Sequence, residues 1–404
     1  MSKFGKPVRP GGGPLSGLRV IEFGQIAAGP FTGMLLADLG ADVVKVEKPD
    51  GGDGMREWPP FFTNSEGDAY SANFASLNRN KRSVTIDFKS EAGRQRLRQL
   101  CDRADIVIEN FRPGVLGKYG FGYEALAETN PRLVYCSISG YGQQGPYAKR
   151  GAFDVTIQAI SGLMSVTGEE DGIPVKCGVP VADFAAGLYA AYSIAAAVFQ
   201  ARETGKGAYI DCSMLGSVLG ISALQTSEYY GNGTPPRKLG TAHPRNAPYQ
   251  GFNGSDKPFV IAAGNDKLWR SVCEAVGMPE LADDPRFASQ TLRAKRQKEL
   301  AAILQERFAR KPAAEWLAEF ERRGVPCAPI NTYEDILHDP AVREMGLIEP
   351  LLLPNGVTTS TVKFPVHISG TETAVYRQPP RHGEHDDEVF AEWLAPAVHS
   401  TINR

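Results

Sequence analysis

The chain lacks any C-x-x-C pair, although it has six cysteines in 404 residues. The cysteines are dispersed, at Cys101, Cys136, Cys177, Cys212, Cys273 and Cys327. This spacing argues against the disulfide framework of a small secreted protein and against a four-cysteine zinc site. We therefore expect reduced thiols and a cytoplasmic protein.

Net charge is nearly absent as well. Lys and Arg number 44 against 46 Asp and Glu, which gives a formal net charge of -2. Such a balance provides no overall field to attract nucleic acid or a membrane surface, so any site for an anion must be local. We predict neither nucleic acid nor a membrane as a partner.

Long hydrophobic runs are also missing. The most apolar stretch, residues 185–201, is shorter than the ~20 residues that a membrane span needs, and it contains two tyrosines. It predicts a buried helix. Residues 1–14 are basic but have no apolar segment, so they predict a disordered leader and not a secretory signal.

The sequence does contain a recurring strand and helix pattern. Residues 18–23 (LRVIEF) are an apolar run, residues 31–41 have helical spacing, and residues 42–48 (DVVKVEK) are a second run. Strand, helix and strand within about 30 residues predict a βαβ unit and a parallel sheet. Because DIVIEN and LVYCSISGYG continue the pattern, we predict an α/β fold with a Rossmann-like, doubly wound parallel sheet.

The composition changes after residue 225. Residues 226–246 are rich in proline and glycine and predict a linker, and residues 247–323 have mixed patterns that predict a smaller α+β lobe. We expect the large lobe to span residues 15–225. Residues 324–404 are then the return segment that completes it.

The first turn, GQIAAGP, leaves the nature of any nucleotide site open. A dinucleotide site needs G-x-G-x-x-G there and an acid at the end of the second strand. Glu47 supplies the acid, but the middle glycine is missing and Lys48 follows directly. NAD binding and a βαβ unit without a nucleotide both remain as alternatives.

Basic residues follow other strand ends or turns and would, if clustered, suit a ligand with several phosphates. They are Lys45, Lys48, the run 78–83 (NRNKRS), Lys89, Arg112 and Lys118.

Five segments in order resemble the class III coenzyme A transferases, the family of formyl-CoA transferase and the carnitine CoA-transferases (CaiB/BaiF). They are LRVIEFGQIAAGPFTGMLLADLGADVVKVEKPDGGD, NRNKRSVTIDFK, ADIVIENFRPGVLGKYGFGYEAL, SISGYGQQGPYAKRGAFD and GVPVADFAAGLYAA. Two further segments, ETGKGAYIDCSML and GTAHPRNAPYQGF, are most similar to succinyl-CoA:glutarate CoA-transferases. The resemblance implies acyl-CoA and small carboxylates as substrates, no permanently bound cofactor, and an interlocked homodimer.

Asp183 stands at the start of the apolar run. From the residues alone, it either caps the helix that follows or does chemistry. The resemblance implies that its carboxylate attacks the thioester of a donor acyl-CoA and then carries the acyl group and CoA in turn. Because burial would raise its pKa, we expect nearby amides or the helix N-terminus to offset that effect.

The resemblance also implies contacts with CoA. Ile26, Ala27 and Ala28 are expected along the CoA chain, and Lys48 near its phospho-adenosine end. Other matching positions are Ile86, Lys89, Asn110, Phe111 and Lys118. A family member has lysine where this chain has Gly151, and whether Arg150 replaces it stays open.

A related activity, α-methylacyl-CoA racemisation, is the alternative. The racemases use a histidine followed by an aspartate, whereas this chain has Phe153 and Asp154 there, and a phenyl ring cannot accept a proton. They also carry a glutamate where this chain has Asn265. Asp154 remains a second-tier site residue.

Two histidine-containing segments complete the candidates. For a dicarboxylic acceptor, the distal carboxylate needs a cation, for which we predict Arg245 beside His243, with Arg237 behind it. His382 and His385 have an H-x-x-H spacing, but no third ligand is evident, so we predict no metal.

Overall fold

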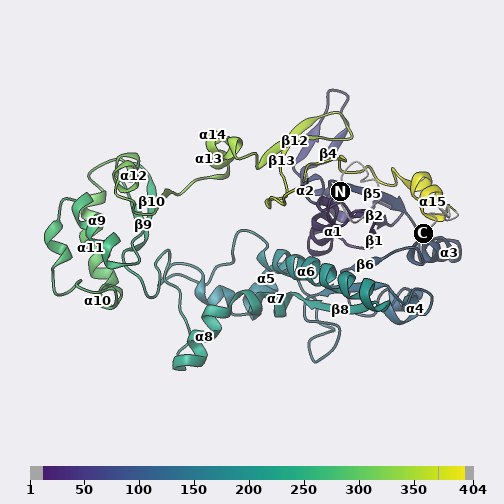
Figure 1. Ribbon diagram of the computed structural model, residues 1–404, viewed down its shortest axis with the longest axis horizontal. Coiled ribbons are helices and arrows are strands. Elements are labelled where there is room, and N and C mark those ends of the chain that lie inside the picture. Colours follow the sequence, from purple (N-terminus) through teal and green to yellow (C-terminus); the bar gives the residue numbers. More distant parts are fainter. Residues whose placement is uncertain (1–11, 372, 396–404) are drawn as a thin grey trace, which may run out of the picture. The chain divides into compact units, whose positions relative to one another are not determined.

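The computed structural model in Figure 1 describes residues 12–371 and 373–395, so most of the expected leader, residues 1–14, lies outside the described residues. The chain forms two compact units. Unit 1 combines Met1–Leu163, Lys176–Asn232 and Arg343–Arg404. Unit 2 combines Met164–Val175 and Gly233–Val342, and therefore includes the range 247–323 expected for a smaller lobe.

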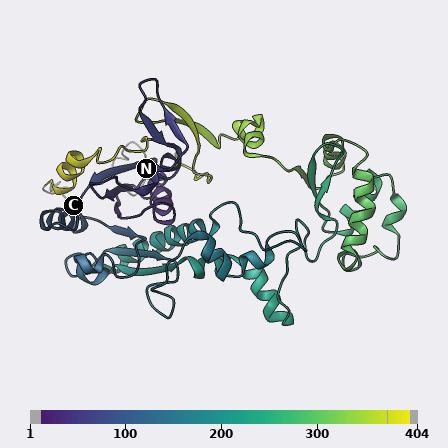
Figure 2. The same ribbon diagram turned by 180° about the vertical axis from the view of Figure 1, so that it is seen from behind.

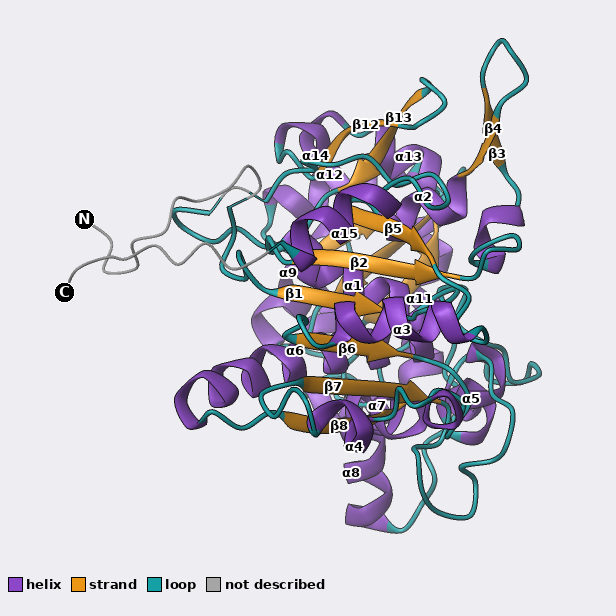
Figure 3. Cartoon of the chain, turned by 90° about the vertical axis from the view of Figure 1, so that its right-hand side faces the viewer, coloured by secondary structure: helices purple, strands orange, loops and turns teal. Residues whose placement is uncertain are grey.

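Unit 1 is built on a six-stranded sheet in which every pair is parallel. Its strands in spatial order are β5 (Lys81–Thr85), β2 (Asp42–Glu47), β1 (Arg19–Glu22), β6 (Ile106–Glu109), β7 (Val134–Ser139) and β8 (Ala208–Ser213). Figure 3 shows this order from edge to edge. The chain order reverses between β1 and β6, so the predicted doubly wound sheet is confirmed, and ligands are expected where the strands end near that point.

Helices cover both faces of the sheet, because the strands carry apolar side chains on both faces. The helices of unit 1 are α1 (Ala28–Asp38), α2 (Ala72–Asn78), α3 (Glu91–Cys101), α4 (Tyr123–Ala127), α5 (Asp154–Ile160), α6 (Val181–Thr204), α7 (Met214–Ile221), α8 (Ala223–Asn232) and α15 (Asp386–Leu394). Val20 and Val43 face α1 and α6 in one buried cluster. Their neighbours Ile21 and Val44 face α3 and α15 in another.

The C-terminal part of unit 1 docks on the sheet's β5 edge. Arg82 of β5 pairs with Glu388 and Glu392 of α15 at 3.0 Å each. Trp393 of the same helix donates its indole N–H to Asp42 at 2.8 Å. Figures 1 and 2 show the yellow α15 beside α3. The short antiparallel pairs β3 (Phe61–Thr63) with β4 (Ala69–Ser71), and β12 (Ile348–Leu352) with β13 (Thr358–Val362), complete the strands of this unit.

Unit 2 has its own antiparallel sheet and its own core. The sheet order is β11 (Cys327–Pro329), β10 (Pro258–Ala262) and β9 (Tyr249–Asn253). The helices are α9 (Asp266–Ala275), α10 (Gln290–Lys295), α11 (Gln297–Phe308), α12 (Ala313–Arg322) and α13 (Tyr333–His338), and α14 (Pro340–Glu344) begins in this unit and ends in unit 1. Aromatic residues such as Trp269, Phe308 and Phe320 fill its core. The start of the expected linker, residues 226–232, is helical as part of α8.

The 24-residue helix α6 is long and apolar enough to cross a membrane by length and composition. One of its faces packs against β7, β8, α1 and α7. Ala186, Ala190 and Ile194 on that face have no exposed surface. These contacts identify α6 as the core helix predicted from the alanine-rich run.

Candidate active site

The turn after β1 is held in a strained conformation. Ile26 has a φ of 66°, which a β-branched residue rarely adopts. Its N–H donates to both carboxylate oxygens of Asp53 at 3.2 Å. Asn110, which follows β6, accepts from the Gln25 N–H and donates to the Gln25 carbonyl oxygen, both at 2.9 Å. The loops after β1 and β6 are therefore tied together at the point where the strand order reverses.

Buried ion pairs lie directly beneath this turn. Lys45 is fully buried, with its Nζ 2.9 Å from Asp53 and 3.1 Å from Glu22, and it donates to the Gly24 carbonyl oxygen. Lys81 is also fully buried, 2.7 Å from Glu22. The nearby acids hold the pKa of Lys45 above its usual range despite its burial, so it stays charged.

These pairs correct part of the phosphate-cluster hypothesis. Lys45 faces the core, and Arg79, Lys81 and Arg82 of the run 78–83 are buried and paired with acids of unit 1. Glu47, considered as a ribose ligand, binds the guanidinium of Arg56 and accepts from the Ser83 hydroxyl. Because both oxygens of Glu47 already accept hydrogen bonds from these residues, its carboxylate is not available to bind a ribose hydroxyl. This removes the main support for an NAD site.

The other basic residues of that set are exposed. Lys48, Lys89, Arg112 and Lys118 lie after the carboxyl ends of β2, β5 and β6. Ala28 and Ile86 have buried side chains in the two large clusters of unit 1, so they present only backbone to a ligand. Phe111 packs against Phe88, which in turn packs against Tyr119, at centroid distances of 6.3 and 5.3 Å.

Asp183 lies in the first turn of α6 but does not cap it. The N-cap residue is Pro180, and no side chain of that residue can accept a hydrogen bond. The Asp183 carboxylate is half-buried and accepts no hydrogen bond from any residue within the described ranges. Burial, with a smaller contribution from the charge of Asp154, raises its pKa to about 7. The expected compensation by amides is therefore wrong, as is the N-cap interpretation.

The first turn of α6, which carries Asp183, packs against α1. Its neighbour Phe184 stacks on Phe31 of α1 with ring centroids 4.6 Å apart. The Thr32 hydroxyl of α1 is 3.4 Å from the Gly187 carbonyl oxygen. These contacts bring α1 and the start of α6 together, and Ile26, Phe31 and Phe184 pack against the same buried cluster of unit 1.

Asp154 accepts a hydrogen bond from the first turn of α6, the helix that carries Asp183. It begins α5, and its Oδ1 accepts from the Ala182 N–H at 2.9 Å while its Oδ2 accepts from the Gln158 side chain at 2.7 Å. Phe153, in the place of the racemase histidine, is exposed. Arg150 stacks on the Tyr147 ring at 3.9 Å.

The residues predicted for the acceptor lie in unit 2. The Arg245 N–H donates to His243 Nδ1 at 3.1 Å, and the His243 ring is 5.0 Å from that of Tyr249. Arg237 lies 3.5 Å from Glu170. Asn265, at the position of the racemase glutamate, caps α9 by accepting from the Leu268 N–H.

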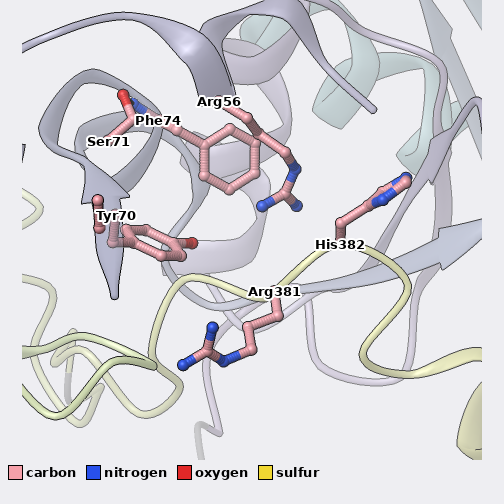
Figure 4. A pocket seen from close by; sticks show the side chains of 7 residues that line it. Arg56, Tyr70, Ser71, Phe74, Arg381 and His382 are labelled. Atoms are coloured by element: carbon pink, nitrogen blue, oxygen red, sulfur yellow. Dashed lines mark hydrogen bonds between the residues drawn. The ribbon is translucent and has the colours of Figure 1, made fainter. Parts of the chain in front are cut away.

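The two C-terminal histidines have structural partners. His385 accepts from the Ser83 N–H at 3.3 Å, and His382 Nε2 is 2.9 Å from the Lys48 carbonyl oxygen. His382 also borders a cavity of about 200 Å³ lined by Arg56, Ala69, Tyr70, Ser71, Phe74 and Arg381, shown in Figure 4. Because Arg56 is paired with Glu47 and Arg381 with Asp68, the cavity offers no uncompensated positive charge.

Sequence reasoning missed Asp53, Gln158 and the hydrogen bonds that join Asn110 to Gln25. The contacts of Asp53 and Asn110 link distant segments, for which no local pattern exists. Gln158, by contrast, stands four residues after Asp154 on the same helix, a spacing at which side chains meet. That spacing was the available signal.

Comparisons with known proteins agree with the geometry. Residues 15–386 match CoA-transferase family III. A succinate–glutarate CoA-transferase from Agrobacterium fabrum is 41% identical over 381 residues, covering 94% of this chain and 95% of that protein. An acetyl-CoA:oxalate CoA-transferase from Acetobacter aceti is 38% identical over 392 residues, covering 96% and 98%. A crystal structure of a CaiB/BaiF family protein from Brucella suis superposes with a TM-score of 0.85 at 41% identity, covering 94% of this chain and 99% of that one.

The named relatives differ in the acid that they use, glutarate in one and oxalate in the other, but share the transfer of CoA. The match covers nearly the whole chain, and the fold superposes on that of the related crystal structure. This chain belongs to CoA-transferase family III, the class III CoA-transferases (EC 2.8.3.-), which move CoA between acyl-CoA thioesters and carboxylic acids.

Proposed function

We propose that this enzyme transfers CoA from succinyl-CoA to a short dicarboxylic acid through covalent intermediates on Asp183. One observation carries the proposal: a half-buried carboxylate with no hydrogen-bond donor among the described residues, in the first turn of α6. Its lone pairs are free for attack, and its partial burial limits access of the water that would hydrolyse an activated acyl group.

The steps follow from the chemistry of a carboxylate. An oxygen of Asp183 attacks the thioester carbonyl, the carbon–sulfur bond breaks, and CoA leaves as a thiolate beside an aspartyl–acyl anhydride. The thiolate attacks the aspartyl carbonyl and releases the donor acid, leaving an aspartyl–CoA thioester. The acceptor carboxylate attacks that thioester, the carbon–sulfur bond breaks, and CoA leaves as a thiolate beside an aspartyl–acceptor anhydride. The thiolate attacks the acceptor carbonyl of this anhydride, which forms the new acyl-CoA and restores the Asp183 carboxylate.

CoA is proposed to lie across the carboxyl edge of the parallel sheet. The backbone of Ile26, Ala27 and Ala28 would border its chain, and exposed Lys48 would meet the phosphates as a point charge. Ile86 would contribute its backbone. The remaining proposed contacts are Lys89, Asn110, Phe111 and Lys118.

The distal carboxylate of the acceptor is proposed to bind Arg245, with His243 fixing the turn that carries it. An arginine can hold a carboxylate through two parallel hydrogen bonds, whereas a monocarboxylic acceptor has no group to place there. Replacing Arg245 with alanine should therefore raise KM for dicarboxylic acceptors and leave monocarboxylic ones unchanged.

An interlocked homodimer is also proposed. Leu188, Tyr192 and Phe199 form an apolar stripe on the face of α6 away from the sheet, and Tyr230 of α8 is 85% exposed. An exposed apolar surface of this kind is typical of an interface.

The cytoplasm is proposed as the compartment. Six free cysteines, four of them buried, support this proposal, and cell fractionation would check it.

An exchange assay by mass spectrometry tests the function. The enzyme is incubated with succinyl-CoA and a pool of short mono- and dicarboxylic acids, beside Asp183→Ala. New dicarboxylic acyl-CoA species should appear only with the unchanged enzyme. Hydroxylamine added after succinyl-CoA should convert Asp183 to a hydroxamate, detected on its peptide. Exchange that survives in the variant would exclude Asp183 as the nucleophile.

A further inference from the structure

Two polar side chains of α5 hold the segment that leads to Asp183. Gln158 is fully buried. Its Oε1 accepts from the Cys177 N–H at 2.8 Å, and its Nε2 donates to Asp154 Oδ2 at 2.7 Å. The other oxygen of Asp154 accepts from the Ala182 N–H at 2.9 Å. One continuous chain of hydrogen bonds therefore joins the backbone at residue 177 to the backbone at residue 182.

This series of hydrogen bonds requires a particular donor or acceptor at each side chain. A buried amide is costly unless both its ends are paired, so Gln158 must turn its oxygen to the Cys177 N–H and its NH₂ to residue 154. Asp154 must then offer an acceptor on both sides, which only a carboxylate does. An amide at 154 would set NH₂ against NH₂.

The start of α6 is also held by the stacking of Phe184 on Phe31, but this contact does not involve the Asp183 carboxylate. Helix α6 begins after Pro180, which provides no side-chain cap, so Asp154 satisfies an N–H of its first turn from a neighbouring helix. Asp183 directly follows Ala182, and its carboxylate has no hydrogen-bond donor within the described residues to orient it. Its direction is set by the backbone that Asp154 and Gln158 hold.

We propose that Gln158 is a positioning residue for the transfer reaction: through Asp154 and the segment 177–182, it fixes the direction in which Asp183 attacks the thioester. The inference rests on the proposed role of Asp183 as nucleophile. Gln158 touches neither CoA nor the acyl group in this role. A misdirected nucleophile loses rate in the chemical step and leaves donor binding intact.

Three variants separate the hydrogen bonds from the charge. Gln158→Met keeps the length of the side chain and removes both bonds, and kcat should fall about ten- to a hundredfold while donor KM changes less than about twofold. Asp154→Asn should lower kcat in the same way, because two NH₂ groups then meet. The double variant D154N/Q158E restores every donor–acceptor pair, since the new amide can donate to the new carboxylate, which still accepts from the Cys177 N–H.

The double variant should recover kcat to within about threefold of the unchanged enzyme. Because it moves the negative charge away from Asp183, the acid limb of its pH–rate profile should also shift to lower pH, in line with the part that Asp154 plays in raising the Asp183 pKa. Gln95→Met, the same change at an exposed position of α3, is the control and should leave kcat unchanged.

The outcomes distinguish this inference from the proposed function. Hydroxamate formation on Asp183 in the unchanged enzyme, together with normal kcat in Gln158→Met, would overturn the positioning role alone. Failure of D154N/Q158E to exceed Asp154→Asn would do the same, and this comparison stands even where Gln158→Met does not fold. If the unchanged enzyme forms no hydroxamate and no new thioester, the proposed function fails and the inference fails with it.

Discussion

At the scale of single residues, two carboxyl groups of unit 1 have pKa values well above the usual range for Asp and Glu. Burial raises the pKa of Asp183 to about 7, and burial likewise raises that of Glu109, at the end of β6, to about 7. Glu109 accepts from the Phe111 N–H at 2.8 Å and so holds the loop that follows β6. Asp183 has no such partner among the described residues, which suits a group that must form bonds to carbon.

The raised pKa predicts how activity depends on pH. In the proposed mechanism Asp183 attacks only as a carboxylate, and below about pH 7 most of it is protonated in the free enzyme. The value of kcat/KM for the donor should therefore rise about tenfold per pH unit below that pKa and level off above it. Measuring initial rates from about pH 5 to about pH 9 checks this. A flat profile would contradict it.

The same shift predicts a cost in stability. The folded protein binds the Asp183 proton more tightly than the unfolded chain, whose pKa is about 4, so this group lowers the free energy of unfolding as the pH rises from about 4 to about 7. Asp183→Asn stays neutral. It should be more stable than the unchanged protein by about 1–3 kcal/mol at about pH 8, and no more stable near pH 4. Thermal unfolding at both pH values measures this, with exposed Asp171→Asn as the control.

Asp53 is expected to support both stability and donor binding. Asp53→Asn and Asp53→Ala each leave buried Lys45 short of an acid and should lower the free energy of unfolding by about 3 kcal/mol. Only Asp53→Ala also removes the acceptor for the Ile26 N–H, so only this variant should raise donor KM severalfold. Denaturation and steady-state kinetics provide both readings. Equal KM values in the two variants would show that the strained turn needs no acceptor, and exposed Asp50→Asn is the control.

At the scale of elements, α1, which follows the strained turn at Ile26, packs closely against α6, which carries Asp183. A Cβ at Gly187 would lie 2.7 Å from the Phe31 ring and 3.4 Å from Thr32 Oγ1. The approach of the two helices therefore depends on the absence of a side chain at this position. It also aligns Phe31 with Phe184, next to Asp183.

Gly187→Ala should accordingly destabilise the protein, although alanine favours helices. Overpacking costs about 1–3 kcal/mol, more than the ~1 kcal/mol gained in helix propensity. Gly231→Ala in α8, where a Cβ meets nothing within 4 Å, is the matched control and should be neutral or stabilising. Chemical denaturation of both variants provides the comparison, and equal stabilities would show that Phe31 moves aside freely.

At the scale of the whole molecule, the exposed apolar face of α6 is the basis of the dimer proposal. Only 39% of the most apolar 18-residue part of α6 is buried within one chain, although the helix packs on the central sheet of unit 1. Tyr192 and Phe199, seven residues apart, are 72% and 69% exposed on this face. Two such side chains on one stripe suit a second copy of the chain better than water.

The double variant Y192E/F199E should therefore shift the enzyme from dimer to monomer and reduce transfer at least tenfold, because charges on the stripe cannot be buried. Light scattering after size-exclusion chromatography reports the mass. Replacing exposed Gln95 on α3 with glutamate should change neither quantity. A monomeric unchanged enzyme with full activity would exclude the dimer proposal.

The sequence by itself determined the parallel sheet, the core helix α6 and the family. Apolar runs, helical spacing and segments such as GVPVADFAAGLYAA are local patterns, and their order along the chain survives folding. Tertiary structure alone decided which charges are available. Lys45 and Lys48 look alike in the sequence, yet one is buried against Asp53 and the other is exposed, because Lys45 lies within the central strand β2 whereas Lys48 follows its last residue. It likewise decided that Asp154 accepts from the first turn of α6 and that Gln158 accepts from the Cys177 N–H, since a hydrogen bond between distant segments leaves no local trace.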